Sequence, residues 1–319
     1  YDPNDFVGVP FEEARDAITE LQNADGNPLL ANAYQERYMP GSTFKVITAG
    51  IGLESGVLTR ETNFPRERQY VPPQTNDPIN NYNGSQCGGD MAEVFRRSCN
   101  IPFAKTAIEL GVDRFVAGTK NWGIDEQLPI DLPRAATSTI GNVENLDKAL
   151  PLLAIRGFGQ SEVQMVPLHM AMVAGAVANG GQMMSPYVVD ATFDQAGREL
   201  NRTSPSLWKT PISPATAALE TEFMTGVVQS GTASCCMTLD GGIQAAAKTG
   251  TAELGLDSNP DLSHAWIIAF APAENPRFAI SVVLTNVQST QDVSATGGRL
   301  AGPIAKDMLD FLLTGQGAI

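Results

Sequence analysis

Apolar residues recur at helical spacing in several segments of this chain. Residues 43–53 (TFKVITAGIGL) show this spacing directly after Pro40-Gly41-Ser42, which predicts a helix that begins at or beside Ser42. Residues 166–179 are apolar, rich in small side chains and followed by two glycines, as is typical of a buried helix and its end. Similar patterns predict helices over residues 91–110 with a break near Pro102, over residues 213–229 and over residues 301–313.

A different pattern fills the last third of the chain. Residues 242–253, 265–271 and 277–286 predict strands, and the last two are joined by a hairpin-like turn. Residues 60–90, rich in Pro, Asn, Gln and Gly, predict a long extended excursion. This order predicts an α+β fold in which helices cover an antiparallel β-sheet beside a mostly helical lobe. We expect a single domain over residues 1–319, with residues 1–59 and 205–319 in the sheet lobe and residues 60–204 in the helical lobe.

The composition is that of an acidic globular protein. Apolar residues make up 43% of the chain and charged residues 18%, and the net charge is −14. Because a surface of this sign repels phosphate backbones, we expect no nucleic-acid partner. The sequence contains no apolar run of about 18 residues and no signal peptide. Since it opens abruptly at Tyr1, we expect it to be part of a larger protein whose anchor lies elsewhere.

The four cysteines and two histidines lack the spacing of a metal site. We therefore expect neither a metal nor another cofactor. Structural disulfides in an oxidising compartment are the favoured interpretation, and buried free thiols are the alternative. Three pairings are open. A bond between the adjacent Cys235 and Cys236 is the least ordinary of them, whereas Cys87 and Cys99 would close a short loop and contribute about 3 kcal/mol.

Ser42 and Lys45 carry candidate chemistry. A hydroxyl at a helix N-terminus and an amine three residues later share one face, and the helix dipole favours negative charge at the hydroxyl. Burial and a nearby cation lower the pKa of a lysine, which makes it a usable base. The same spacing occurs at Ser206 and Lys209, in a stretch without a helix start. The pair alone therefore does not distinguish a nucleophile from a capping serine beside a solvated lysine.

Two further motifs follow in order. Ser98-Cys99-Asn100 begins 56 residues after Ser42, and Lys248-Thr249-Gly250 begins 150 residues after Ser98 and continues into Thr251. Each could separately be a turn or a strand-edge charge. Together they resemble the penicillin-binding protein and serine β-lactamase superfamily. The resemblance is to class B, high-molecular-weight penicillin-binding proteins and runs from end to end through the segments YDPN (1–4), YMPGSTFK (38–45), GFGQ (157–160), VPLHM (166–170), NGG (179–181) and GTA (231–233).

The resemblance implies a D,D-transpeptidase that cross-links peptidoglycan stem peptides and is acylated by β-lactams. It makes Ser42 the nucleophile, Lys45 its proton acceptor and Ser98 a proton relay. Asn100 would hold the substrate amide, and Lys248 and Thr249 its carboxylate. The implied role of Gly250 is close approach of the strand to the substrate. The backbone N–H groups of Ser42 and Thr251 would form an oxyanion hole.

The resemblance also implies features beyond the site. Two sheet strands of the family would lie before Tyr1, and we expect these strands and a membrane anchor to lie outside this sequence. Cys99 would point away from the substrate, which fits a disulfide to Cys87 that pins the loop carrying Ser98 and Asn100. The expected location is the extracytoplasmic face of the bacterial membrane, with cell-wall synthesis proteins as partners.

Two classes of alternative stay open. One is a hydrolase, a β-lactamase or D,D-carboxypeptidase, which needs a base for deacylating water. No ExxLN motif stands between Asn100 and Lys248, and the sequence at 144–146 has the wrong order. The other is a non-catalytic penicillin-binding sensor or scaffold, in which acylation is a signal.

Overall fold

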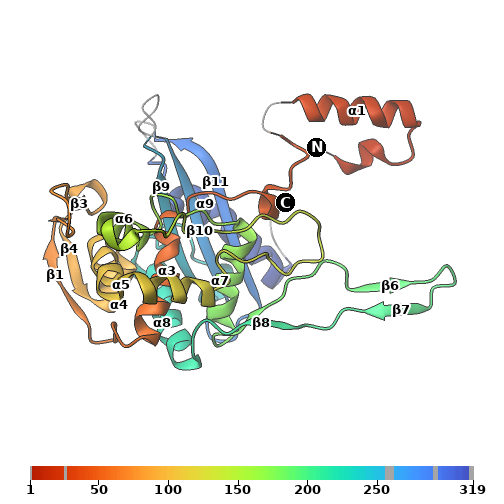
Figure 1. Ribbon diagram of the computed structural model, residues 1–319. Helices are drawn as coiled ribbons and strands as arrows, with labels where there is room; N and C mark the ends of the chain where they lie inside the picture. The colour runs from red at the N-terminus through yellow and green to blue at the C-terminus, as the bar shows by residue number, and fades with distance from the viewer. Residues whose placement is uncertain (1, 25–26, 256–261, 290–293, 316–319) are drawn as a thin grey trace.

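A three-stranded antiparallel sheet forms the centre of the computed structural model, which describes residues 2–24, 27–255, 262–289 and 294–315 (Figure 1). The strands are β9 (Ala246–Glu253), β10 (Leu262–Ala271) and β11 (Phe278–Gln288), in the order β11-β10-β9. Nine consecutive residues of β10 are buried, which explains the unbroken apolar run over residues 265–271. The helices α7 (Pro167–Ala178) and α9 (Gly297–Thr314) pack against β10 and β11.

A group of helices packs beside this sheet and carries the candidate nucleophile. The 3-10 turn η2 (Gly41–Phe44) leads directly into α3 (Lys45–Glu54), whose first eight residues are all buried. A helix that is apolar on every side belongs in a core, and α3 accordingly lies among other helices, while the turn η2 before it contacts β9. The neighbouring helices are α4 (Met91–Arg96), α5 (Ile101–Asn121), α6 (Leu150–Arg156) and α8 (Pro214–Ser230).

The extended excursion before α4 folds into two short β-ladders. The first pairs β1 (Asn63–Glu67) with β4 (Cys87–Asp90), and the second pairs β2 (Gln69–Tyr70) with β3 (Ile79–Asn80). The predicted disulfide between Cys87 and Cys99 is present and ties β4 to the turn between α4 and α5. The excursion is therefore fastened to the segment that carries the second motif.

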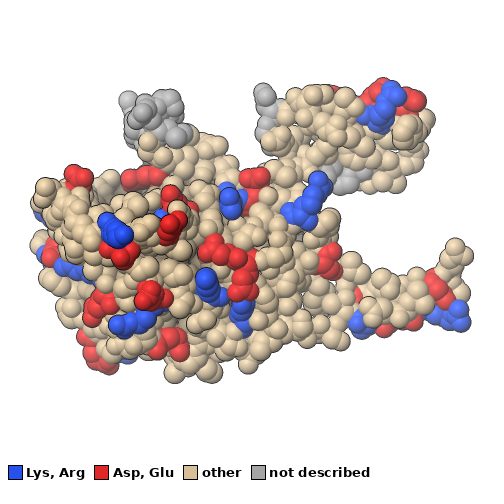
Figure 2. All heavy atoms as spheres, in the orientation of Figure 1, with Lys and Arg blue, Asp and Glu red and all other residues tan. Residues whose placement is uncertain are grey.

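Two segments extend away from the main body. Helix α1 (Phe11–Asn23) follows the 3-10 turn η1 (Pro3–Phe6), and none of the residues of α1 is buried. Figure 1 also shows the hairpin of β6 (Ala191–Phe193) and β7 (Glu199–Arg202) projecting from the other elements. Charged residues gather at its end (Figure 2), and within the hairpin Arg198 pairs with Asp194 and Arg202 pairs with Glu199. The remaining elements are α2 (Asn32–Gln35), β5 (Met183–Met184), β8 (Leu207–Lys209) and the 3-10 turns Tyr82–Gly84, Leu146–Lys148 and Asp240–Gly242.

The α+β class is confirmed, and so are all the long predicted elements. The segment at 91–110 breaks where predicted, but its second helix runs on to Asn121 past Gly111, whose φ is 72°. The last helix begins at Gly297 rather than residue 301, and β9 begins at Ala246 rather than residue 242. Periodicity did not predict α1 or α6, nor the β5–β8 and β6–β7 ladders, whose strands are only two to four residues long.

Within the described part of the chain, no helix combines the length and the apolar character needed to cross a bilayer. The described residues also contain no group of three or more histidine, cysteine, aspartate or glutamate side chains that could hold a metal ion.

Candidate active site

Ser42 lies in the 3-10 turn η2, and Lys45 is the first residue of α3. In a 3-10 helix, residues three apart are eclipsed, so Ser42 and Lys45 lie one above the other. The predicted helix therefore begins with a 3-10 turn rather than at an ordinary α-helical N-cap. Because the first N–H groups of a helix lack intrahelical acceptors, the amide of Ser42 is available to a ligand.

Two glycines bring β9 against this turn. A Cβ atom on Gly250 would lie 2.6 Å from the carbonyl oxygen of Pro40 and 3.0 Å from the amide nitrogen of Thr43. A Cβ atom on Gly41, whose φ is 54°, would lie 2.5 Å from the carbonyl oxygen of Thr251. A side chain at Gly250 would thus collide with the protein's own backbone beside the nucleophile, a close contact that the sequence did not predict.

Lys45 is fully buried and contacts the second motif. Its Nζ atom donates to the carbonyl oxygen of Ser98 at 2.7 Å and to Oδ1 of Asn100 at 2.8 Å, and lies 3.3 Å from Ser98 Oγ. Among the described residues, no hydrogen bond joins this Nζ atom to the hydroxyl of Ser42. The lysine is therefore held on the Ser98 side of the nucleophile in this structure.

Lys248 approaches the same serine from β9. Its Nζ atom lies 2.8 Å from Ser98 Oγ and 2.9 Å from the carbonyl oxygen of Thr249, and its side chain is fully buried. Burial lowers the pKa of Lys248 to about 7. Burial, and after it the charge of Lys248, hold the pKa of Lys45 well below its usual range.

Aromatic rings, not carboxylates, surround the two ammonium groups. The Nζ atom of Lys45 lies 5.4 Å from the ring centre of Phe103, and that of Lys248 lies 5.8 Å from the ring centre of Phe95. No ion pair to either lysine exists among the described residues. Because two buried unpaired cations side by side are strongly unfavourable, this arrangement favours a neutral amine at one of them.

The turn that carries Ser98 and Asn100 is fixed from three sides. Ser98 has a φ of 58°, a left-handed conformation that a non-glycine residue adopts when its surroundings impose it. The buried Asn81 accepts hydrogen bonds from the amides of Asn100 at 2.8 Å and Ile101 at 3.2 Å. It thereby caps the start of α5. The disulfide at Cys99 completes the support, with Cys99 itself buried. Sequence reasoning missed Asn81, which lies in a loop without periodicity.

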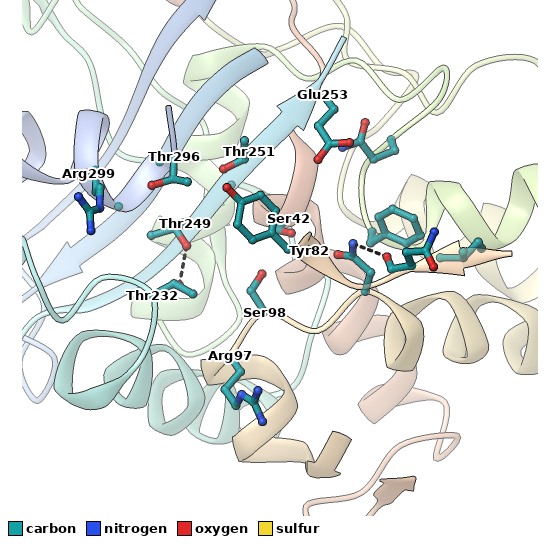
Figure 3. A pocket seen from close by; sticks show the side chains of 18 of the residues that line it. Ser42, Tyr82, Arg97, Ser98, Thr232, Thr249, Thr251, Glu253, Thr296 and Arg299 are labelled. Atoms are coloured by element: carbon teal, nitrogen blue, oxygen red, sulfur yellow. Dashed lines mark hydrogen bonds between the residues drawn. The ribbon is translucent and has the colours of Figure 1, made fainter. Parts of the chain in front are cut away.

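These motifs open onto one cavity of about 560 Å³. Figure 3 shows Ser42, Ser98, Thr249 and Thr251 around it. Thr232 lies beside Thr249, with 2.6 Å between their hydroxyl oxygens. The sequence singled out Thr232 within a matching segment but gave it no role. Further cavity residues that the motifs did not predict are Asn80, Tyr82, Arg97, Gln160, Cys235, Glu253, Thr296 and Arg299.

The second Ser-x-x-Lys sequence has a different environment. Its last three residues form strand β8, which pairs with β5. Lys209 forms an ion pair with Glu126 at 2.7 Å. Ser206 accepts a hydrogen bond from the amide of Ser185 through its backbone carbonyl. The spacing alone thus carries no active-site geometry.

The remaining two cysteines pair with each other. Cys235 and Cys236 form a disulfide between neighbours, the pairing that seemed least ordinary from the sequence. That expectation is corrected, and among the described residues no cysteine is free. Cys235 lines the cavity, one turn beyond Thr232.

The site combines a serine before a buried lysine, a second serine between two buried lysines and a Lys-Thr-Gly strand. On this α+β framework, these features define the class of active-serine penicillin-recognising proteins. The sequence matches the family of the penicillin binding protein transpeptidase domain over residues 1–310, and the chain belongs to that family.

Named relatives agree with this assignment. The chain is 35% identical over 312 residues to the peptidoglycan D,D-transpeptidase PbpA of Mycolicibacterium smegmatis, covering 96% of this chain and 61% of the relative. It is 34% identical over 322 residues to PbpA of Mycobacterium tuberculosis, covering 99% of this chain and 63% of the relative. The chain thus spans less than two thirds of the length of these relatives.

Solved structures show the same fold. The ceftriaxone acyl-enzyme complex of penicillin-binding protein A from M. tuberculosis superposes with a TM-score of 0.88 at 32% identity, covering 98% of this chain and 69% of that one. Its penicillin G acyl-enzyme complex gives a TM-score of 0.87 at 32% identity, covering 98% and 70%.

Proposed function

We propose that this chain is a serine D,D-transpeptidase, which transfers the acyl group of a peptidoglycan stem peptide to an amine through an ester on Ser42. The observation that carries the proposal is the pair of buried lysines, Lys45 and Lys248, joined through Ser98 without a carboxylate partner in the part of the chain that the structure describes. Burial lowers the pKa of both amines, so this arrangement favours a neutral amine, and a serine needs such a base to become a nucleophile.

The two lysines and Ser98 form the proposed proton path. Lys45 takes the proton of the Ser42 hydroxyl as its oxygen attacks the penultimate D-alanine carbonyl. Ser98 touches both Nζ atoms and so relays that proton to the departing amine. The C–N bond of the terminal D-alanine then breaks, leaving the acyl group on Ser42 and free D-alanine.

β9 and η2 hold the substrate in this proposal. Lys248 and Thr249 bind the terminal carboxylate, and the hydroxyl of Thr232 orients that of Thr249 across 2.6 Å. Asn100 holds the substrate amide. Gly250 and Gly41 let β9 lie close to η2, and the amides of Ser42 and Thr251 donate to the oxyanion from these two elements. Each such donor lowers the barrier by about 3 kcal/mol.

A second amine completes the reaction. It attacks the ester carbonyl, the Ser42 oxygen leaves with a proton returned through Lys45, and a cross-link results. A β-lactam acylates Ser42 by opening its ring, so no fragment departs and the adduct persists.

For a peptidoglycan transpeptidase, the proposed location is outside the cytoplasmic membrane. There an anchor in the complete protein would hold it, and other cell-wall synthesis proteins would be its partners. Its substrate lies in the cell wall, and its two disulfides fit an oxidising compartment.

One experiment tests acylation and transfer together. The protein is treated with labelled penicillin, the adduct is located by peptide mass spectrometry, and its lifetime is followed. A D-Ala-D-Ala peptide is then supplied with and without an acceptor amine.

We expect an adduct on Ser42 that lasts many minutes and a transfer product that grows with the acceptor concentration. Rapid release of hydrolysed penicillin would indicate a β-lactamase, and hydrolysis unaffected by the acceptor would indicate a carboxypeptidase. For a non-catalytic sensor, Ser42→Ala would leave cross-linking in cells unchanged.

A further inference from the structure

The side chains of Thr249, Thr251 and Glu253 line the same cavity from one face of β9. Alternate residues of a strand point to the same side and are spaced by about 7 Å. Glu253 is the one acidic residue among the described residues that line this cavity. It therefore places a negative charge one strand repeat beyond Thr251, at the opposite end from Thr249.

The proposed function fixes the direction in which a peptide lies along this row. Its terminal carboxylate is at Thr249, and its scissile carbonyl is at Ser42 and the amide of Thr251. A peptide anchored at these two points continues along β9 in the same direction, because β9 is an edge strand of its sheet. The residue that precedes D-Ala-D-Ala then lies beside Glu253.

The charges of the cavity are arranged at opposite ends. In Figure 3, Arg299 lies on the side of Thr296 and Thr249, whereas Glu253 lies beyond Thr251. The other cationic residue that lines the cavity, Arg97, is already engaged, since it donates to the backbone oxygen of Gln86 and to Glu93. The cavity is thus suited to an anion at one end and a cation at the other.

The carboxylate of Glu253 is available for a ligand. Its side chain is exposed, and it has no hydrogen bond or ion pair to any residue that the structure describes. Pairing of β9 with β10, where Glu253 is opposite Ser263, fixes the backbone from which it projects.

We infer that Glu253 is a specificity-determining residue that favours donor stem peptides with a free side-chain ammonium on the residue before D-Ala-D-Ala. This inference rests on the proposed function and adds to it the chemical class of the donor. The ammonium and the carboxylate form an ion pair at the cavity mouth, and it strengthens binding of the donor before Ser42 attacks.

Two peptides test this role. Both are Nα-acetyl-L-lysyl-D-alanyl-D-alanine, one with a free side-chain amine and one with that amine acetylated. The rate of D-alanine release at low substrate concentration gives kcat/KM for each. For the wild type we expect a preference of about two- to five-fold for the free amine, the range of an exposed ion pair. The ratio of the two kcat/KM values should fall toward one in high salt, because salt screens an exposed ion pair.

Substitutions assign the preference to this side chain. Glu253→Gln should reduce the ratio to about one, and Glu253→Lys should reverse it for a peptide whose lysine is succinylated. Glu274→Gln is the matched control, because Glu274 is an exposed residue at the other end of the same sheet, in the turn between β10 and β11. It removes the same charge and should keep the wild-type ratio.

The outcomes separate the two claims. Equal rates for both wild-type peptides, or a preference that Glu253→Gln retains, would overturn the role of Glu253 while leaving the proposed function intact. A wild type that releases D-alanine from neither peptide and forms no penicillin adduct would overturn the proposed function and this inference with it.

Discussion

The Oγ atom of Ser98 lies 2.8 Å from the Nζ atom of Lys248, a residue 150 positions further along the chain. The same oxygen lies 3.3 Å from the Nζ atom of Lys45. One hydroxyl therefore joins two buried amines that come from different elements. Because neither amine has a carboxylate partner among the described residues, the site can hold a proton on either lysine and pass it through Ser98.

Lys45→Met should remove the base while keeping a side chain of similar length. We expect the second-order rate of acylation by a fluorescent penicillin to fall by about 10²- to 10⁴-fold, the usual contribution of a general base. Lys209→Met is the matched control, since Lys209 ends the other Ser-x-x-Lys sequence and lies in β8. It should acylate at the wild-type rate. If the Lys45→Met variant had an unchanged melting curve and was still acylated at the wild-type rate, Lys45 would not be the base.

The pH profile of acylation should report the interaction between the two lysines. Because burial and the charge of Lys248 lower the pKa of Lys45, the acylation rate should fall with acid pH only as Lys45 takes up a proton. Lys248→Met removes one cause of the lowered pKa of Lys45, so the acid limb should move to higher pH. Rates measured from pH 5 to 9 check this. An acid limb at the same pH in both proteins would show that the charges do not interact.

Glu220 should make stability depend on pH. This residue of α8 is fully buried opposite Gly50, and neither of its carboxyl oxygens has a partner among the described residues. Burial, and after it the charge of Glu54, raise its pKa well above the usual value. The unfolded chain ionises at a lower pH than the folded protein, so this residue favours unfolding increasingly as the pH rises toward its folded pKa.

Glu220→Gln removes this ionisation with little change in shape. The free energy of unfolding of the variant, relative to wild type, should therefore increase between pH 5 and pH 8, as measured by denaturant titration. Glu222→Gln, an exposed change on the same helix, is the control and should alter stability by about 0.5 kcal/mol or less. A difference between Glu220→Gln and wild type that is the same at both pH values would contradict the raised pKa.

The sequence predicted the motifs and long elements, because periodicity and fixed spacing are local properties. It did not predict the contact of Lys45 with Asn100 in place of Ser42, which depends on how the α4–α5 turn meets α3. Nor did it predict Asn81, Thr232 or Glu253, single polar residues whose roles arise from elements distant in the chain. Nor did it predict that Gly250 lies against the protein backbone at Pro40, which depends on how β9 meets η2.

The Cys87–Cys99 disulfide should stabilise the fold through loop closure. Its cysteines are 12 residues apart, and the double variant Cys87→Ala/Cys99→Ala should lose about 3 kcal/mol of unfolding free energy. The control is Cys235→Ala/Cys236→Ala, which removes a disulfide between neighbours that closes almost no loop. Denaturant titration should show a much smaller loss for this control. Equal losses would indicate that chain entropy is not the source of the stabilisation.

Gly250→Ala should separate β9 from the nucleophile turn. The added methyl group would lie 2.6 Å from the Pro40 carbonyl oxygen, and since backbone surrounds it, the strand or the turn must move. A shift of about 1 Å in reacting groups costs on the order of 100-fold in rate, so penicillin acylation should fall by about that factor. Gly226→Ala in α8 is the control, because a Cβ atom there would lie an ordinary 3.8 Å from its nearest neighbour, the Cδ atom of Arg96. That variant should acylate normally and gain up to about 1 kcal/mol of stability. Wild-type acylation by Gly250→Ala would show that the site does not require the close contact of β9 with η2.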